Sequence, residues 1–289
     1  MSPARVPENS KRVFIIPIGG GEDKQKEMLI HRKFVEFSGG TDSDIVVVPT
    51  ASQLEETGPD YNEIFRDLGA GQVEFLPITS REDCDNPSYV EMLDRATGIF
   101  MTGGNQLRLS TILGGSLVTQ KIRRCNAAGV PVAGTSAGAS IMSEHMVAGG
   151  SGSSGPSEDG VNLAPGMGLT NAVIIDQHFT QRNRLGRLLS ASSYNPFLIG
   201  LGIDEDTAAF IGADDVFEVV GSGTVTVVDA GDMTYSSMWQ ASSGEALSLL
   251  GLKIDILGEG CRYDLSNRQA YPPDGENNGF CSLPETKDD

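Results

Sequence analysis

The sequence predicts an α/β protein built on a mostly parallel sheet that helices cover on both faces. In the first half, short runs of β-branched and apolar residues are each followed by a turn, and amphipathic segments lie between several of them. After Gly168, similar runs follow one another with fewer helical segments between them. Strands that alternate with helices form parallel sheets, so the second half predicts later strands of the same sheet and an antiparallel edge.

The expected elements follow in chain order. Strands of the first half are expected at residues 12–18, 44–50, 72–78, 97–103 and 130–135. Amphipathic helices are expected at residues 26–37 and 116–128. Strands of the second half are expected at residues 172–177, 197–203, 207–212, 215–221 and 224–230.

The chain of 289 residues is long enough for one large α/β domain, which we place at residues 12–263. Residues 1–11 are expected to be a flexible N-terminus, and residues 264–289 a polar C-terminal tail with little packing. Residues 147–168 are rich in glycine, serine and proline. Connections of that length inside a compact domain are often functional, so we expect this one to border the active site.

Composition argues against several classes of function. A formal net charge of −18 disfavours nucleic-acid binding, which needs a basic surface. No apolar stretch approaches the ~20 residues of a membrane helix, and the polar first residues lack the pattern of an export signal, which predicts a cytoplasmic protein. The four cysteines are widely spaced and predict free thiols. Neither HExxH nor a Cys/His cluster occurs, so no metal is expected.

The turn GGGED at residues 19–23 is similar to the start of a dinucleotide-binding motif. Counted from its first glycine, the third glycine of G-x-G-x-x-G would fall on Lys24. Two acidic residues in the first helical turn would also repel a pyrophosphate. We therefore expect no nucleotide cofactor.

The segment GTSAG places Ser136 directly after a predicted strand. This G-x-S-x-G pattern is typical of a nucleophile elbow, where small neighbours let a sharp strand-to-helix turn expose the serine hydroxyl. The amide of Ala137 would then help to stabilise an oxyanion. A serine that caps an alanine-rich helix has the same local sequence, so the motif alone leaves both interpretations open.

A nucleophilic serine needs a base, and the chain has three histidines. His31 lies within the first helical segment. His145 is expected on the helix that follows Ser136, nine residues on and therefore about 13 Å away. His178 ends the strand at residues 172–177, where active-site residues of α/β proteins lie. It is the candidate base, and a packing role is the alternative.

Two acids are candidates to orient that histidine. Asp176 lies two residues before His178 and would point to the same side of an extended strand. Glu205 lies where another predicted strand ends in acidic residues, and a carboxylate there could fix the imidazole tautomer. The spacing does not choose between them.

Substrate groups are suggested by two further segments. Arg182, Arg184 and Arg187 crowd beside the histidine, where they would clamp a carboxylate or form a solvated helix face. The segment TGGNQLRL at residues 102–109 offers the amide of Gly104 or Asn105 as a second oxyanion donor, or it is a glycine-rich turn that starts a helix.

Five segments together resemble the cyanophycinases, serine peptidases related to dipeptidase E. They lie within residues 12–231 and read FMTGGNQLRL, AGTSAGASIM, PGMGL, IDQHFTQRNRLGRLL and GLGIDEDTA. The resemblance implies a three-layer α/β/α sandwich of the flavodoxin-like, class I glutamine-amidotransferase type, with serine in place of cysteine. It also implies a homodimer that needs no cofactor.

The resemblance further implies hydrolysis of cyanophycin, a polyaspartate with arginine on its β-carboxyls, to β-Asp-Arg dipeptides. By motif, Ser136 is the nucleophile, His178 the base and Glu205 the triad acid, with Asp176 as the alternative acid. The residues matched to the substrate pocket are Gln106, Asp176, Gln177, Arg182, Arg184 and Arg187.

Two other functions compete with this one. A dipeptidase E-like enzyme would cleave aspartyl dipeptides. A catalytically inactive binding protein of the same fold would show no hydrolysis, with or without Ser136. The long segment at 147–168 and the three arginines favour the polymer. A glutamine amidotransferase is disfavoured because position 136 is serine.

Overall fold

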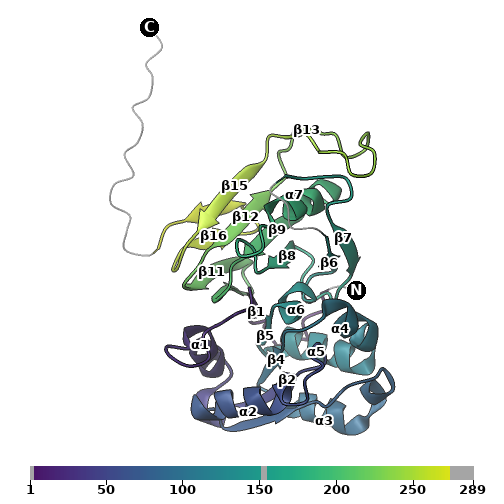
Figure 1. Ribbon diagram of the computed structural model, residues 1–289. Coiled ribbons are helices and arrows are strands. Elements are labelled where there is room, and N and C mark those ends of the chain that lie inside the picture. Colours follow the sequence, from purple (N-terminus) through teal and green to yellow (C-terminus); the bar gives the residue numbers. More distant parts are fainter. Residues whose placement is uncertain (1–2, 151–154, 274–289) are drawn as a thin grey trace.

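The fold is built around a mixed sheet of nine strands (Figure 1). The structure is a computed structural model and describes residues 3–150 and 155–273. The parallel half contains five strands in the spatial order β1-β5-β4-β2-β3. Their bounds are β1 Ile15–Ile18, β2 Asp44–Val48, β3 Gln72–Phe75, β4 Gly98–Met101 and β5 Val132–Thr135. Each of the five strands expected in the first half is present, a few residues shorter than the apolar run that predicted it.

Helices cover both faces of this parallel half. Side chains alternate along the strands, so Ile45 and Val47 pack on one face while Val46 and Val48 pack on the other. The first face is covered by α1 Leu29–Phe37 and α2 Thr57–Asp67. The helices over the opposite face are α3 Pro87–Arg95, α4 Gln106–Leu113 and α5 Leu117–Ala128.

The second half adds an antiparallel edge to the main sheet, but the other strands expected to continue that sheet form a sheet of their own. The strands β10 Thr207–Ile211 and β11 Val216–Gly221 extend the main sheet from β1 in antiparallel fashion. The strands β8 Val173–Gln177, β9 Ile199–Ile203, β12 Val225–Asp229 and β15 Lys253–Leu257 form a separate four-stranded sheet. In the main sheet, β1 is flanked by β5 on one side and β10 on the other, so β8 and β9 cannot pair with β1.

The helix expected after Ser136 is much shorter than predicted, so the placement of His145 on it is wrong. Helix α6 spans only Ala137–Ser140, and His145 begins strand β6, His145–Gly149. The helix does not continue, because the carbonyls of Ile141 and Met142 accept hydrogen bonds from Met167 and Leu169. This pairing is non-local, which a helical pattern in AGASIMSEHM does not reveal.

Residues 147–168 are partly regular, because β6 pairs with β7 Asn162–Pro165 in a hairpin. Residues 151–154 lie outside the described residues. Helix α7 Leu185–Tyr194 follows β8 and packs on the second sheet. A small ribbon of β13 Tyr235–Ser236 and β14 Leu249–Leu250 leads into β15.

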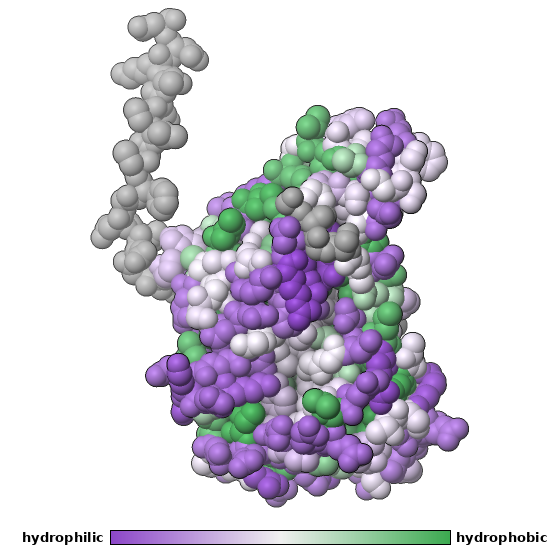
Figure 2. All heavy atoms as spheres, in the orientation of Figure 1, coloured by the Kyte–Doolittle hydropathy of each residue, from purple (hydrophilic) through white to green (hydrophobic). Residues whose placement is uncertain are grey.

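The segment expected to be a polar tail begins inside the main sheet. The strands β16 Arg262–Asp264 and β17 Gln269–Tyr271 add to β11, and Leu265 is buried. The rest of that segment, residues 274–289, lies outside the described part of the chain. Figure 2 shows hydrophobic surface over β15, where Ile254 and Ile256 are exposed, whereas the lower half of the same view is mostly hydrophilic.

Candidate active site

The nucleophile candidate lies on a strained turn between β5 and α6. Ser136 has φ 52° and ψ −108°, a backbone conformation that residues other than glycine rarely adopt. Its side chain makes no capping hydrogen bond to α6. A Cβ on the nearby Gly134 would lie 2.6 Å from the carbonyl carbon of Gly138, so the turn closes only with small flanking residues. The geometry fits a nucleophile elbow, and the Ser136 side chain does not cap α6.

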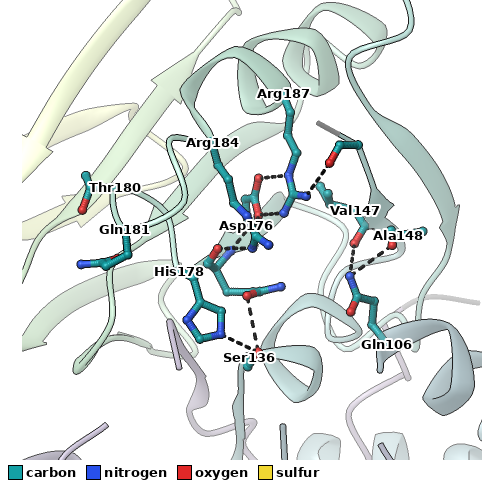
Figure 3. A network of polar contacts seen from close by, with 12 residues as sticks. Gln106, Ser136, Val147, Ala148, Asp176, His178, Thr180, Gln181, Arg184 and Arg187 are labelled. Atoms are coloured by element: carbon teal, nitrogen blue, oxygen red, sulfur yellow. Dashed lines mark hydrogen bonds and ion pairs between the residues drawn. The ribbon is translucent and has the colours of Figure 1, made fainter. Parts of the chain in front are cut away.

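A chain of two hydrogen bonds leads away from the serine hydroxyl. Ser136 Oγ lies 2.9 Å from His178 Nε2, and His178 Nδ1 lies 2.6 Å from Glu205 Oε1. Figure 3 shows His178 pointing at Ser136. An ionised carboxylate only accepts hydrogen bonds, so Nδ1 carries the proton and Nε2 is free to accept one from the serine. This arrangement fits proton abstraction from Ser136.

The end of β1 holds all three segments together. The carbonyl of Ile18 accepts from the N–H of Ser136 at 3.0 Å, and the carbonyl of Gly19 accepts from that of His178 at 2.7 Å. The carbonyl of Gly20 accepts from Asp206, the residue after Glu205, at 2.9 Å. Three consecutive carbonyls therefore set the relative positions of the serine, the histidine and the acid.

The glycines of the same turn leave space for the two partners of the serine. A Cβ on Gly20 would lie 2.6 Å from His178 Nε2, and one on Gly21 would lie 3.0 Å from the Glu205 carboxyl group. The sequence of this turn does not fit a nucleotide-binding motif and indicates no other role for it. Its glycines are explained by close approach to the imidazole and the carboxylate.

Burial lowers the pKa of His178 below its ordinary value of 6.5. The hydrogen bond to Glu205 opposes this effect, and the positive charge of Arg182 adds to it. The neutral imidazole, which is the form that accepts a proton, is therefore the favoured form at neutral pH.

Asp176 does not contact His178 and forms a buried cluster with two arginines. Its side chain is fully buried, with Arg187 Nε 2.7 Å from Oδ2 and a second bond from Arg187 to Oδ1. Arg184 Nη1 lies 3.5 Å from Oδ1 and donates to the Gln177 carbonyl. Two guanidinium groups thus share one carboxylate (Figure 3). Burial and the neighbouring Arg187 lower the pKa of Arg184 to about 10, so it stays charged at neutral pH.

Of the remaining expected pocket residues, Gln177 lies close to Ser136, whereas Gln106 holds two neighbouring elements together. Gln177 Oε1 lies 3.4 Å from Ser136 Oγ. The Gln106 amide donates to the carbonyls of Val147 and Ala148, at 3.5 and 3.2 Å, and so ties α4 to the β6–β7 hairpin (Figure 3). Arg182 is exposed in the turn before α7.

Of the three expected oxyanion donors, Asn105 is already engaged within the chain. Its N–H donates to Ala51 O at 2.9 Å, and its side chain caps α4 by accepting from Arg108 N–H. For Gly104 and Ala137, no acceptor for the N–H occurs within the described part of the chain. These two amides remain available for a developing oxyanion, and we do not retain Asn105.

A buried polar group beside the nucleophile was not foreseen. Glu22 is 6% exposed, and its oxygens accept from Tyr61 OH and Thr135 Oγ1, both at 2.6 Å. His31 is fully buried with Nε2 3.8 Å from Glu22 Oε1, so it belongs to this cluster and not to the triad. The partners lie far apart in sequence, and a run of acids after glycines gives no signal for such a cluster.

The described residues hold neither a metal site nor a membrane-spanning helix. These residues contain no group of three or more His, Cys, Asp or Glu side chains arranged to hold a metal ion. Cys84, Cys125 and Cys261 are free thiols, and Cys281 lies outside the described range. No helix within residues 3–150 and 155–273 is long and apolar enough to cross a membrane.

Comparison with known proteins agrees with the geometry. Residues 14–219 match the model of peptidase family S51. The chain belongs to this family. It is 42% identical to a cyanophycinase of Geminocystis herdmanii over 91% of this chain and 96% of that protein. It is 39% identical to one from a Nostoc species over 93% of this chain and 90% of that protein. Members of peptidase family S51 are hydrolases, so this chain is a peptidase.

The fold of a solved relative is also similar. A peptidase from an acI-B1 actinobacterium superposes with a TM-score of 0.59 at 25% identity. The match covers 76% of this chain and 93% of that structure. The mixed α/β architecture is therefore shared with a solved peptidase.

Proposed function

We propose that this member of peptidase family S51 is a serine-type exopeptidase that hydrolyses cyanophycin to β-Asp-Arg dipeptides. The observation that carries the proposal is the hydrogen-bonded series Ser136–His178–Glu205 on a nucleophile elbow. The substrate follows from relatives named cyanophycinases, which match this chain over nearly all of its length. Neither metal nor cofactor takes part in the proposed reaction.

In the proposed mechanism, His178 Nε2 removes the proton of Ser136 while Oγ attacks the scissile carbonyl carbon. The amides of Gly104 and Ala137 stabilise the oxyanion. When the C–N bond breaks, the imidazolium gives its proton to the leaving amine, and an ester on Ser136 remains. Water, deprotonated by His178, then hydrolyses the ester and restores the hydroxyl group. Glu205 holds the Nδ1–H tautomer throughout.

The arginine cluster supplies a candidate binding site for the acyl side of the substrate. Arg184 and Arg187 share the single carboxylate of Asp176, which leaves an excess of one positive charge next to Gln177 and Ser136. Each unit of cyanophycin bears the free α-carboxylate of its arginine. We propose that Arg184 and the exposed Arg182 bind that group, and that Asp176 and Gln106 act by positioning their neighbours.

Further features of the molecule are part of the proposal. The parallel half with helices on both faces supports a three-layer α/β/α sandwich of the class I glutamine-amidotransferase type. The three free thiols support a cytoplasmic location, and the charge of −18 disfavours nucleic acid as a partner. We expect a homodimer, so light scattering should give about twice the chain mass of 30.6 kDa; a mass of one chain would contradict this.

The decisive assay offers insoluble cyanophycin and α-aspartyl dipeptides to the same preparation. We expect β-Asp-Arg, identified by mass, and a kcat/KM for the polymer well above that for the dipeptides. A preference for the dipeptides would favour a dipeptidase E-like activity. Absence of hydrolysis of either substrate would favour a binding protein of the same fold.

A further inference from the structure

A cavity of about 270 Å³ opens on Ser136 from the side of the turn after β1. Its wall contains Lys24, the neighbouring Glu22, and Ser52 and Thr57, whose hydroxyl oxygens lie 2.8 Å apart. Ser136 and His178 line the same cavity. The arginine cluster behind Gln177 is a separate group on β8 and α7. The nucleophile therefore lies between two sites with cationic side chains, the arginine cluster and Lys24, which is paired with Glu22.

The turn that carries Lys24 is fixed by its own hydrogen bonds. The carboxylate of Asp23 accepts from four backbone N–H groups, at 2.7 to 3.1 Å. The donors belong to Gln25, Lys26, Glu27 and Met28. The N–H of Asp23 donates to Asp206 at 2.8 Å, next to the triad acid. A backbone that is already ordered loses little entropy when a ligand binds, which favours a binding role.

The ammonium of Lys24 is held in place yet has hydrogen-bonding capacity left. Nζ lies 3.6 Å from Glu22 Oε1 and 4.4 Å from the centre of the Tyr61 ring, and the side chain is 42% exposed. Glu22 already accepts short bonds from Tyr61 and Thr135. Within the described residues, Nζ donates no hydrogen bond within 3.5 Å, so the N–H groups that do not face Glu22 or the Tyr61 ring are available to an anion.

We propose that Lys24 binds a carboxylate of the substrate unit that leaves when Ser136 is acylated. This inference rests on the proposed function. His178, which gives the leaving amine its proton, lines the same cavity, so the leaving unit lies there. Every unit of the polymer carries at least one free carboxylate, and Ser52 and Thr57 add neutral donors. Lys24 is thus a specificity-determining residue that the five motifs do not contain.

The test uses two soluble substrates and three proteins. The substrates are the dimer (β-Asp-Arg)2 and an analogue in which the carboxylates of the leaving unit are carboxamides. The proteins are the wild type, Lys24→Met and the matched control Lys26→Met, which removes the same charge from an exposed residue of the same turn that does not line the cavity. The measured quantity is the ratio of kcat/KM for acid over amide.

We expect this ratio to be about 10 to 100 in the wild type and in Lys26→Met, since a charged hydrogen bond is lost with the amide. In Lys24→Met it should be close to 1, and Lys24→Arg should restore part of it. A ratio in Lys24→Met as large as in the wild type would overturn the inference. Partial unfolding of the variant does not change the ratio, because the same folded fraction acts on both substrates. If the wild type cleaves neither substrate, the proposed function itself fails.

Discussion

At the scale of single residues, the site depends on which carboxylate accepts the hydrogen bond of the His178 imidazole. Glu205 lies 2.6 Å from His178 Nδ1, whereas the fully buried Asp176 is occupied by Arg184 and Arg187. The two acids therefore have different tasks. Glu205 would fix a tautomer, and Asp176 would bind two buried guanidinium groups and offset one of their two positive charges.

Replacing each acid by its amide should separate these tasks. We expect Glu205→Gln to lower kcat by about 10⁴, as the loss of a triad acid does, with little change in Tm. Asp176→Asn should instead lower stability, because it leaves buried arginines without their anion. Steady-state kinetics and thermal unfolding of both variants check this. An inactive Asp176→Asn beside an active Glu205→Gln would show that Glu205 is wrongly assigned.

The pH dependence of the reaction follows from the environment of His178. Burial lowers the pKa of this imidazole below 6.5, and the reaction needs its neutral form. Since a lower pKa keeps the imidazole neutral in mildly acidic solution, kcat/KM should fall only below pH 6.5. A profile of kcat/KM against pH, with an acidic midpoint below 6.5, is the expected result; a midpoint above that value would contradict it.

At the scale of elements, the end of β1 holds the parts of the site together. Consecutive carbonyls from Ile18 to Gly20 bind the segments that carry the serine, the histidine and the acid. These segments come from two different sheets, so the turn after β1 is where the sheets meet. Its glycines give the imidazole and the carboxylate room to approach.

A pair of glycine variants tests this role of the turn. Gly20 and Gly69 have nearly the same backbone angle, φ +93° and +90°, but a Cβ on Gly20 would overlap the His178 ring and one on Gly69 meets nothing within 4 Å. We expect Gly20→Ala to lower kcat/KM at least 100-fold, on the scale of a misplaced catalytic group. Gly69→Ala should carry similar backbone strain with normal activity. Equal activity of the two variants would exclude the role proposed for the turn.

Sequence patterns predicted the elements that depend on local residues. The five strands of the parallel half follow from apolar runs, and so do the positions of Ser136 and His178 directly after strands. The short α6 and the separate second sheet depend on distant partners, such as Met167 bonding to Ile141 and β10 occupying the edge of β1. The same holds for Glu22, whose partners Tyr61 and Thr135 are 39 and 113 residues away.

At the scale of the whole molecule, a buried ion cluster joins the second sheet to the segments around it. Arg187 on α7 binds Asp176 on β8 and donates to the Gly150 carbonyl at 3.3 Å, just after β6. Its side chain is only 4% exposed. The second sheet, its helix and the β6–β7 hairpin are therefore linked through one guanidinium group.

Removing that group should destabilise the fold as a whole. We expect Arg187→Met to lower the free energy of unfolding by about 3 to 5 kcal/mol, because the buried Asp176 carboxylate loses both hydrogen bonds from Arg187 and keeps only the 3.5 Å contact with Arg184. The control Arg182→Met, an exposed arginine five residues earlier, should change it by less than about 1 kcal/mol. Urea unfolding of both variants measures the difference, and equal stabilities would contradict the structural role of the cluster.

The most direct test concerns the nucleophile. Ser136→Ala should be compared with the wild type for release of β-Asp-Arg from cyanophycin, with Tm measured on the same samples. We predict a loss of about 10⁴ to 10⁶ in kcat, the size found when a serine nucleophile is removed, with the protein still folded. Activity within tenfold of the wild type in folded Ser136→Ala would contradict serine catalysis by this protein.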